Sequence, residues 1–273
     1  MKCERIYLKD VYEFLGADNA NPTLDVYIPD DASESKNAKP CMIVCPGGGY
    51  AYCSPREAEP IALKFVSEGF NTFVLTYSTE SYRFPTQIRE VAAAVEILYK
   101  NKEAWNCDIS KICIIGFSAG GHLAAHYSTM FDCKEVRAVF ENSKPVNACV
   151  LCYPVISADL EVAHQGSFLN LIGHAPENQK EEDYFSCDKQ VSDKTPPTFI
   201  WSTSFDEIVP IENSLRYATA LSRHKIPYEL HIYPYGNHGL ATCDKMTNDQ
   251  ITEVIEYAKP WIDEVKKWLR LVL

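Results

Sequence analysis

The chain has 273 residues, of which 46% are hydrophobic and 23% charged, with a formal net charge of −11 and 11 cysteines. A chain this acidic repels phosphate backbones, which argues against a nucleic-acid partner and disfavours a polyanionic substrate. No stretch approaches the roughly 18 uncharged apolar residues of a membrane span, and the first residues lack the apolar core of a signal peptide. The composition therefore predicts a globular, cytoplasmic protein without a membrane partner.

The cysteines are odd in number, and several lie inside apolar runs, which favours buried reduced thiols over a disulfide framework. Cys149 and Cys152 match the spacing C-x-x-C, a spacing used in metal and redox sites. They lie within the apolar run "ACVLCYPVI", however, and no second pair follows at zinc spacing. We interpret them as strand cysteines of the core, and we expect no metal and no organic cofactor.

The first strands are close together in the sequence. Residues 23–29, "TLDVYIP", alternate apolar and polar side chains as a strand does, and the polar residues 30–40 are typical of a loop between two strands. Residues 41–50, "CMIVCPGGGY", predict a buried strand that ends in a glycine loop. No helix separates the strands before residue 41, so we expect antiparallel pairing at one edge of the sheet.

From residue 41 onwards, strands alternate with helices. Further strands are expected at 70–78, 111–116, 146–156, 195–204 and 228–234. Helices are expected at 57–69, 85–101, 118–130, 211–225 and 248–273, the last one kinked or divided by Pro260. The middle strands are nearly continuous apolar runs, as strands buried on both faces should be. This order predicts an α/β fold with a doubly wound, mostly parallel sheet flanked by helices.

Residues 157–195 break this alternation. They are polar, rich in Gly, Pro, Asn and Glu, and contain no clear strand. An insertion of this length is usually functional, so we expect a small cap with one or two short helices inside a single domain spanning 1–273. His164 and His174 lie in this cap, where a surface role is favoured over a substrate contact.

The pentapeptide Gly116-Phe-Ser-Ala-Gly120 stands where a strand ends and a helix begins. G-x-S-x-G in this context is the nucleophile-elbow pattern. Ser118 would adopt a strained backbone so that its oxygen projects from the sheet edge, and side chains at the two glycine positions would collide where strand and helix cross. The alternative is a loop serine in a tight turn. The strand before it and the helix after it favour a nucleophile.

A serine hydroxyl is a weak nucleophile and needs a base, and in this fold the acid and the histidine follow the serine in the chain. Asp206 comes directly after the strand at 195–204. His238 lies between Gly236 and Gly239 in the loop after the next strand. The sequence thus predicts Asp206 as the acid and His238 as the base.

Other side chains could fill these roles. Glu207 adjoins Asp206, although an aspartate at the strand end is favoured. His122 and His126 lie on the helix of the serine itself, and their side chains would point along that helix rather than at the exposed hydroxyl. His231 lies within a strand, where packing or exposure is favoured over catalysis.

Acyl transfer also needs backbone donors for the oxyanion. One is the amide of Ala119, which follows the serine. Gly47, Gly48 and Gly49 in "CPGGGYAY" leave their amides unobstructed and could supply the others. The alternative is a plain glycine-rich turn. A phosphate-binding loop is excluded because no G-K-[ST] follows.

With these elements together, the chain resembles the α/β-hydrolase-fold serine esterases, and in particular their acetyl-xylan-esterase-like, carbohydrate-esterase branch. The resemblance covers roughly residues 20–270 and rests on "VCPGGGYAYCSPREAEPIALKFVSEGFNTFVLTYS", "GFSAGGHLAAH", "STSFDEIVPIENSLRYATAL" and "YPYGNHGL". Two positions depart from the pattern. Pro46 stands where lipase-like relatives have histidine, and Tyr77-Ser78 stands where many relatives have Tyr-Arg, so one supporting polar contact is expected to differ.

The resemblance implies Ser118 as nucleophile, Asp206 as acid and His238 as base, with oxyanion amides from Ala119 and from Gly48 or Gly49. It implies a carboxylic ester hydrolase that forms an acyl-enzyme and removes short acyl groups, such as acetyl, from a carbohydrate or another small ester. The expected pocket residues beside the cap are Tyr50, Tyr52 and Arg56. A peptidase or amidase of the same fold and a non-catalytic binding protein remain the alternatives, and homo-oligomerisation is left open.

Overall fold

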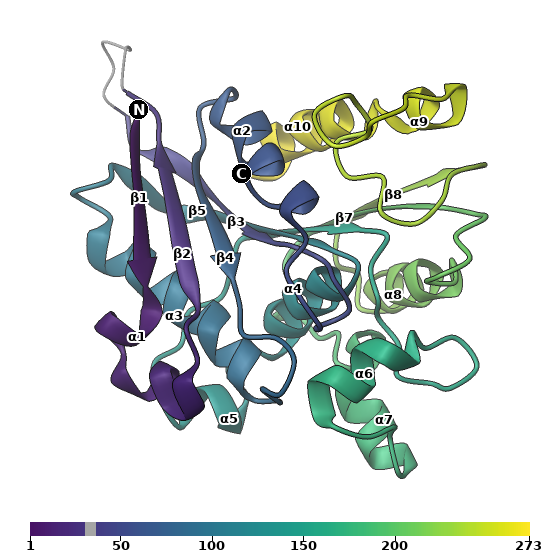
Figure 1. The fold of residues 1–273 in the computed structure, drawn as a ribbon, viewed down its shortest axis with the longest axis horizontal. Helices are drawn as coiled ribbons and strands as arrows, with labels where there is room; N and C mark the ends of the chain where they lie inside the picture. Colours follow the sequence, from purple (N-terminus) through teal and green to yellow (C-terminus); the bar gives the residue numbers. More distant parts are fainter. Residues whose placement is uncertain (31–36) are drawn as a thin grey trace.

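The computed structural model describes residues 1–30 and 37–273, and its centre is an eight-stranded β-sheet with helices on both faces (Figure 1). The strands are β1 (Lys2–Tyr7), β2 (Thr23–Ile28), β3 (Lys39–Cys45), β4 (Asn71–Thr76), β5 (Cys107–Phe117), β6 (Ala148–Cys152), β7 (Thr198–Thr203) and β8 (Tyr228–Tyr233). Their order across the sheet is β1-β2-β4-β3-β5-β6-β7-β8. β2 runs antiparallel to both of its neighbours, and the other pairings are parallel. The doubly wound, mostly parallel sheet with an antiparallel edge is therefore confirmed.

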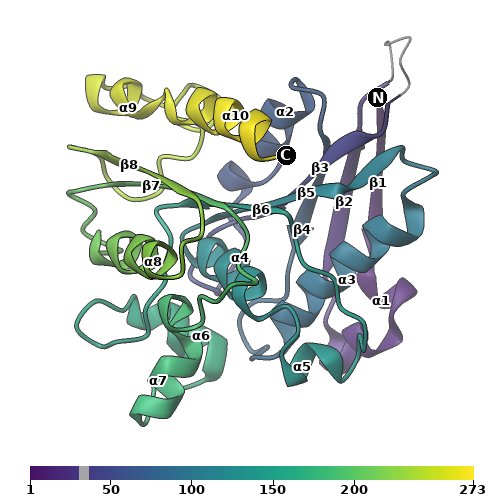
Figure 2. The same ribbon diagram turned by 180° about the vertical axis from the view of Figure 1, so that it is seen from behind.

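Helices α2 and α10 cover one face of the sheet, and α3, α4 and α8 cover the other (Figures 1 and 2). The helices are α1 (Leu8–Val11), α2 (Glu59–Val66), α3 (Thr86–Asn101), α4 (Ala119–Met130), α5 (Lys134–Arg137), α6 (Gln165–Ile172), α7 (Gln179–Phe185), α8 (Glu212–Arg223), α9 (Glu253–Ala258) and α10 (Trp261–Val272). Short 3-10 turns lie at Glu13–Asn19, Pro55–Glu57 and Cys187–Lys189. None of the helices in residues 1–30 and 37–273 is both long enough and apolar enough to cross a membrane.

The central strands are buried on both faces, so the sheet separates two hydrophobic cores. Side chains of β5 alternate between them, as the twofold period of a strand requires. Ile112 and Ile114 join the core under α3, α4 and α8. Cys113 and Ile115 join the core under α2 and α10. This packing fixes the position of β5, and with it the turn that carries Ser118.

All 11 cysteines are free thiols. Cys149 and Cys152 lie on β6 and are fully buried. Their C-x-x-C spacing thus belongs to a core strand, as we interpreted it from the sequence.

The ends of the chain differ from the predicted elements in detail. β1 and α1 were not identified, because the exposed and half-exposed side chains of β1 leave no strong apolar pattern. Pro260 caps α10 and separates it from α9, as expected, but residues 248–252 are not helical. In the predicted loop at 30–40, Lys39 and Pro40 already belong to β3, and residues 31–36 lie outside the described residues.

The stretch from 157 to 195 contains α6, α7 and the 3-10 turn Cys187–Lys189, and no strand. In Figures 1 and 2, α6 and α7 lie next to each other, on the side of the sheet that α4 and α8 cover. That this stretch acts as a cap within a single domain stays a prediction.

Ser78, at the departure from the family pattern, makes a buried contact. Glu90, on α3, is fully buried, and its carboxylate accepts hydrogen bonds from the amide of Ser78, at 2.7 Å, and from the Ser78 hydroxyl. Within residues 1–30 and 37–273 no cation contacts this carboxylate, so burial outweighs the two hydrogen bonds and raises the pKa of Glu90 to about 8.

Candidate active site

Ser118 lies in a strained turn between β5 and α4, with φ 52° and ψ −118°. The glycines on either side allow a close backbone crossing. A Cβ on Gly116 would lie 2.1 Å from the carbonyl oxygen of Gly120, and a Cβ on Gly120 would lie 2.2 Å from the carbonyl oxygens of Cys45 and Pro46. The strain and the crowding that the G-x-S-x-G pattern predicts are therefore both present.

Backbone hydrogen bonds hold this turn from two directions. The Ser118 amide donates to the carbonyl of Cys152 at 3.0 Å, which ties the turn to β6. The Ser118 carbonyl accepts from the amides of His122 and Val155, at 3.1 and 3.0 Å. The backbone of the serine is thus fixed, while its hydroxyl contacts His238.

Three side chains predicted from the sequence form one hydrogen-bonded chain. His238 Nε2 lies 2.7 Å from Ser118 Oγ, and His238 Nδ1 lies 2.6 Å from Asp206 Oδ2. Asp206 is buried, and its other oxygen accepts from the amides of Ile208 and Val209, both at 2.9 Å. The anchored carboxylate sets the imidazole so that Nδ1 donates to it and Nε2 can accept the hydroxyl proton. A hydroxyl in this position can be activated for nucleophilic attack.

None of the alternative acid and base side chains forms a hydrogen bond with Ser118 or His238 in the described part of the chain. Glu207 is exposed beside the buried Asp206. His122 is fully buried, with its ring nitrogens 2.8 Å from the Tyr50 hydroxyl and 2.9 Å from the Phe185 carbonyl, and burial lowers its pKa to about 4. His126 is also buried, and His231 contacts Glu229 at 2.6 Å.

Backbone amides without a hydrogen-bond acceptor lie beside Ser118 in the described part of the chain. The Gly47 amide is occupied, because it donates to Glu57 Oε2 at 2.9 Å. In the part of the chain that the structure describes, the amides of Gly48 and Gly49 have no hydrogen-bond acceptor, and the Ala119 amide opens α4, where no intrahelical acceptor exists. A Cβ on Gly47 would lie 3.1 Å from Ser118 Cβ, so the glycine loop packs directly against the elbow. These three amides are available to an oxyanion.

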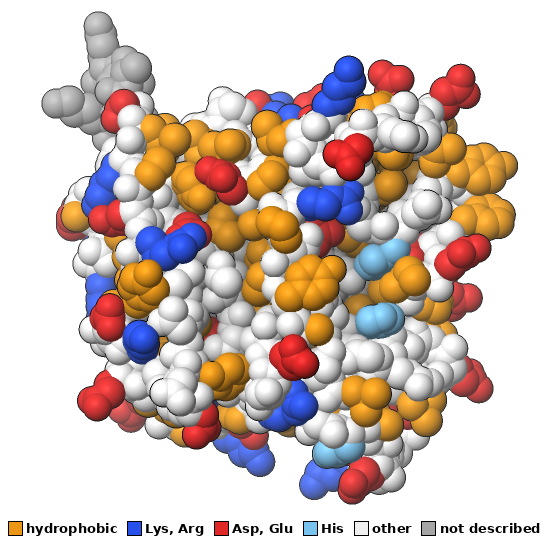
Figure 3. Space-filling view, viewed as in Figure 1, with side chains coloured by type: hydrophobic (Ala, Val, Ile, Leu, Met, Phe, Trp, Pro, Cys, Tyr) orange, Lys and Arg blue, Asp and Glu red, His pale blue; other side chains and the backbone are white. Residues whose placement is uncertain are grey.

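A cavity of about 440 Å³ opens at Ser118 and His238. The remaining residues that line it are Gly48, Gly49, Ala51, Tyr52, Ser54, Arg56, Glu57, His164, Gly166, Asn170, Ile208 and Gly239. In Figure 3, histidine side chains reach the surface among apolar ones, beside α4 and above α6 as placed in Figure 1. The volume lies within the range of sites for small molecules.

Two of the three predicted pocket side chains line this cavity. Tyr52 is 59% exposed at its rim. Arg56 also lines it, while its guanidinium donates to the Thr247 carbonyl at 2.6 Å and to Asn248 Oδ1 at 2.7 Å.

The expectation for Tyr50 is wrong. Its side chain is only 1% exposed and does not line the cavity. Tyr50 has a positive φ of 58°, and this turn directs the ring inward, where the ring of Tyr77 lies 5.8 Å away and the hydroxyl meets His122. The turn after the three glycines therefore directs Tyr50 inward and Tyr52 outward, which composition alone could not indicate.

Two residues of the stretch 157–195, His164 and Asn170, line the cavity, although the sequence did not single them out as pocket residues. His164 precedes α6, is half-exposed and lines the cavity, with Nδ1 2.8 Å from Ser167 Oγ, so the substrate contact that the sequence left open stays a prediction. Burial and the nearby His238 lower the pKa of His164. Asn170, on α6, lines the cavity and donates to the Gly49 carbonyl at 2.9 Å. His174, by contrast, is exposed, as expected.

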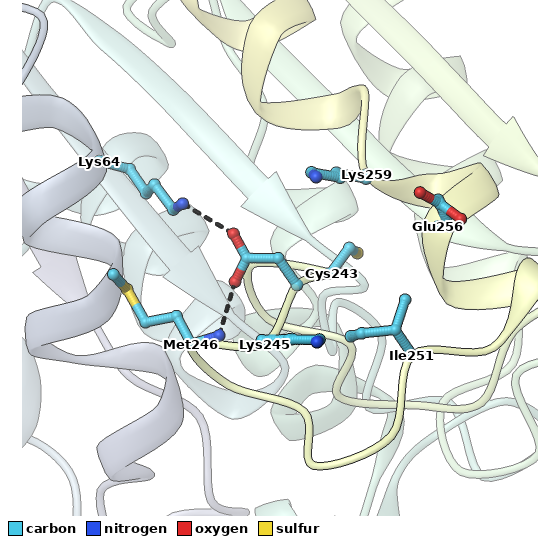
Figure 4. Close-up of a pocket in the computed structure, with 8 residues that line it drawn as sticks. Lys64, Cys243, Lys245, Met246, Ile251, Glu256 and Lys259 are labelled. Carbon is cyan, nitrogen blue, oxygen red and sulfur yellow. Dashed lines mark hydrogen bonds and ion pairs between the residues drawn. The ribbon is translucent and has the colours of Figure 1, made fainter.

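A second cavity, of about 390 Å³, lies between α2 and the segment that leads into α9 (Figure 4). Lys64 reaches from α2 to Asp244 at 2.7 Å, and Lys245 and Lys259 also line this cavity. None of the predicted site residues borders it. Within residues 1–30 and 37–273, no group of three His, Cys, Asp or Glu side chains is placed to hold a metal ion.

Comparison with known proteins finds relatives whose names include esterases. The sequence pattern of the BD-FAE family matches residues 24–221. Endo-1,4-beta-xylanase B of Butyrivibrio fibrisolvens is 36% identical over 88% of this chain and 38% of its own length. Acetylxylan esterase of Xylanibacter ruminicola is 30% identical over 82% of this chain and 44% of its own length. The chain thus spans less than half the length of these two curated relatives.

A solved structure matches over nearly the whole chain. The crystal structure of an acetyl ester-xyloside bifunctional hydrolase from Caldicellulosiruptor lactoaceticus superposes with a TM-score of 0.85 at 38% sequence identity. The match covers 98% of this chain and 96% of that one. The α/β-hydrolase fold expected from the sequence is thereby confirmed.

Proposed function

Because this chain belongs to the BD-FAE family of α/β hydrolases, we propose that it hydrolyses carboxylic esters with Ser118, His238 and Asp206 as its catalytic triad. The observation that carries the proposal is the continuous contact from Asp206 Oδ2 through both ring nitrogens of His238 to Ser118 Oγ, at 2.6 and 2.7 Å. A base within hydrogen-bond reach of the nucleophile, itself oriented by a buried carboxylate, is the arrangement that two-step acyl transfer requires.

The first step forms the acyl-enzyme. His238 Nε2 takes the hydroxyl proton as Ser118 Oγ attacks the ester carbonyl carbon, and the carbonyl oxygen becomes an oxyanion. The amide of Ala119, with that of Gly48 or Gly49, donates to this oxygen. Asp206 stabilises the imidazolium, and it holds the neutral imidazole in the tautomer that carries its proton on Nδ1. Collapse of the intermediate breaks the carbon–oxygen bond to the alcohol, which leaves with the proton from His238.

The second step releases the acid. His238 takes a proton from a water molecule, whose oxygen attacks the acyl carbon and forms a second oxyanion at the same amides. Collapse breaks the bond to Ser118 Oγ, which recovers its proton from His238. The balance is one ester and one water in, one carboxylic acid and one alcohol out, with no metal or cofactor required.

We further propose short acyl groups, such as acetyl, on a carbohydrate or another small alcohol as the substrate. The cavity of about 440 Å³ has polar side chains from Arg56, His164 and Asn170 that suit hydroxyl groups, and Tyr52 offers an exposed ring at the rim. The names of two similar proteins, an acetylxylan esterase and an acetyl ester-xyloside hydrolase, point to the same chemistry. The proposal includes a single domain over 1–273, with residues 157–195 as a cap over the site.

A substrate panel tests the function. We expect the highest kcat/KM on acetyl esters, including acetylated xylo-oligosaccharides, with a steady fall through butyryl to octanoyl p-nitrophenyl esters. Faster cleavage of aminoacyl p-nitroanilides than of acetyl esters would instead assign a peptidase or amidase. Failure of a fluorophosphonate probe to label Ser118, read by peptide mass spectrometry, would assign a binding protein.

A further inference from the structure

Glu57 is a buried carboxylate in the active-site cavity that the proposed mechanism does not use. It ends the 3-10 turn Pro55–Glu57, is only 5% exposed, and lines the same cavity as Ser118. Burial of a carboxylate costs free energy unless donors satisfy it. Burial does raise the pKa of Glu57, while its hydrogen bonds to Tyr153 and Gly47 and the nearby His238 and Arg56 oppose that rise.

One oxygen of Glu57 holds the glycine loop, which we define as residues 46–49. Oε2 accepts the Gly47 amide at 2.9 Å. This contact fixes the orientation of the peptide plane that precedes Gly47. It thereby positions the following amides, those of Gly48 and Gly49, which face the oxyanion in the proposed mechanism. A Cβ at Gly47 would lie 2.6 Å from Oε2, so the contact also requires glycine at this position.

The other oxygen of Glu57 leads to the histidine loop, which we define as residues 234–248. Oε1 accepts the Tyr153 hydroxyl at 2.7 Å. The same hydroxyl oxygen accepts the Ala241 amide at 3.0 Å, three residues after His238. The Tyr153 ring meets the His238 ring edge to face, with centroids 5.0 Å apart. The carboxylate is thus connected to the base through one tyrosine.

We propose that Glu57 is a positioning residue that couples the oxyanion donors of the glycine loop to the catalytic base of the histidine loop. This inference rests on the proposed function. Two other side chains hold the glycine loop, since the Tyr77 hydroxyl donates to the Pro46 carbonyl at 2.7 Å and Asn170 donates to the Gly49 carbonyl. Both donate to carbonyl groups, and in the described part of the chain neither forms a hydrogen bond with the histidine loop. Glu57 binds an amide of one loop and, through Tyr153, the backbone of the other.

The coupling matters because both loops act on the same transition state. Oxyanion donors must meet the developing charge while His238 transfers the proton, and displacement of either group by a fraction of an ångström lowers kcat. Ground-state binding depends on the rest of the cavity lining and should change little. A positioning role therefore predicts a loss in kcat without a matching rise in KM.

The positioning role of Glu57 can be tested by steady-state kinetics on p-nitrophenyl acetate, with three single variants and one double variant. In Glu57→Gln, the side-chain oxygen can still accept from Gly47, but the amide group cannot accept from Tyr153. We expect kcat to fall about 10- to 100-fold with KM within about twofold. Tyr153→Phe keeps the buried ring and the Gly47 contact, and we expect a smaller fall, about threefold to tenfold. Glu59→Gln, two positions on and exposed, is the matched control and should keep the wild-type kcat.

The double variant separates coupling from local damage. If Tyr153 acts through Glu57, Tyr153→Phe should cost much less in the Glu57→Gln background than in the wild type. Losses in kcat that multiply, a rise in KM in place of a fall in kcat, or wild-type kcat in Glu57→Gln would each overturn the proposal. If Glu57→Gln does not fold, as judged by circular dichroism, Tyr153→Phe decides alone, and unchanged kcat in that variant overturns the proposal.

Failure of this inference is distinguishable from failure of the proposed function. If Ser118→Ala abolishes hydrolysis while the Glu57 and Tyr153 variants keep the wild-type kcat, the esterase function stands and the coupling role is wrong. If Ser118→Ala itself keeps full hydrolysis, the proposed function fails, and the coupling role fails with it.

Discussion

His238 Nε2 lies 2.7 Å from Ser118 Oγ, although 120 residues separate the two in the chain. β8 is the third strand from β5 in the sheet, so the loop after β8 must return over about 14 Å of sheet to bring the histidine to the serine. Gly236 makes the return possible. Its φ is 141°, and a Cβ there would lie 2.8 Å from the Thr203 side chain, whose hydroxyl donates to the Gly236 carbonyl at 2.8 Å.

The orienting acid is the first point to test. In Asp206→Asn the carboxylate that accepts from His238 Nδ1 is lost, and the imidazole is held in the wrong tautomer. We expect kcat for p-nitrophenyl acetate to fall by a factor on the order of 10⁴, with KM little changed. Glu207→Gln, at the exposed neighbour, should keep wild-type kcat. Loss of activity in Glu207→Gln with retention in Asp206→Asn would reassign the acid.

The crowded elbow predicts an effect on stability. In Gly116→Ala, the added methyl group would overlap the Gly120 carbonyl, which is backbone and cannot move aside. We expect the free energy of unfolding to fall by more than about 3 kcal/mol. In Gly69→Ala, where no atom lies within 4 Å and only the positive φ of 88° opposes the change, about 1 kcal/mol should be lost. Urea denaturation measures both, and equal losses would show that crowding at the elbow is not the cause.

The contact of Ser118, His238 and Asp206 and the strained turn at Ser118 were predictable because each rests on a local pattern. Ser118, Asp206 and His238 each follow a predicted strand, and parallel strands bring their carboxyl ends to one edge. The direction of a side chain in an irregular loop has no such pattern. Tyr50 and Tyr52 are two residues apart in the same loop, yet one is buried and the other exposed, because a positive φ at Tyr50 turns its ring into the core.

The placement of Glu57 and His164 in the cavity also escaped prediction, for a related reason. Glu57 lies among other charged residues, and nothing in its sequence neighbours indicates that Gly47 and Tyr153, 10 and 96 positions away, satisfy its oxygens. His164 lies in the stretch without strands, where only the placement of α6 brings it to the cavity. Long-range contacts of this kind depend on packing rather than on periodicity.

Glu90 predicts a measurable pH dependence of stability. In the folded protein this carboxyl stays protonated up to about pH 8, whereas in the unfolded chain it ionises near 4.5. Between these values the unfolded chain binds fewer protons than the folded one, so stability falls as the pH rises, by an amount on the order of a few kcal/mol. Above about pH 8 the carboxyl is ionised in both states, so the contribution of Glu90 to the free energy of unfolding no longer changes with pH.

The variant Glu90→Gln isolates that contribution. A glutamine can accept from the Ser78 amide and donate to the Ser78 hydroxyl without carrying charge. We expect its free energy of unfolding to match the wild type near pH 5 and to exceed it at pH 8. A difference between the two proteins that does not change over this range would contradict the account of Glu90.

The cavity lining predicts a substrate-dependent effect of His164. Its Nε2 has no hydrogen-bond partner in the described part of the chain and is free for a hydroxyl group of the alcohol. In His164→Ala, KM for an acetylated xylo-oligosaccharide should rise about fivefold, the equivalent of one hydrogen bond of about 1 kcal/mol. KM for p-nitrophenyl acetate, which has no hydroxyl group, should change little. The exposed His174→Ala is the control, and equal rises for both substrates would contradict a contact with the alcohol.

The most direct test of the account is kcat/KM for p-nitrophenyl acetate in Ser118→Ala. Removal of the hydroxyl leaves the cavity, the oxyanion amides and the contact between His238 and Asp206 in place, so binding should persist while acyl-enzyme formation cannot occur. We predict a fall of at least about 10³-fold, to the residual rate that the oxyanion amides and binding alone can supply. Retention of the wild-type kcat/KM would contradict Ser118 as the nucleophile.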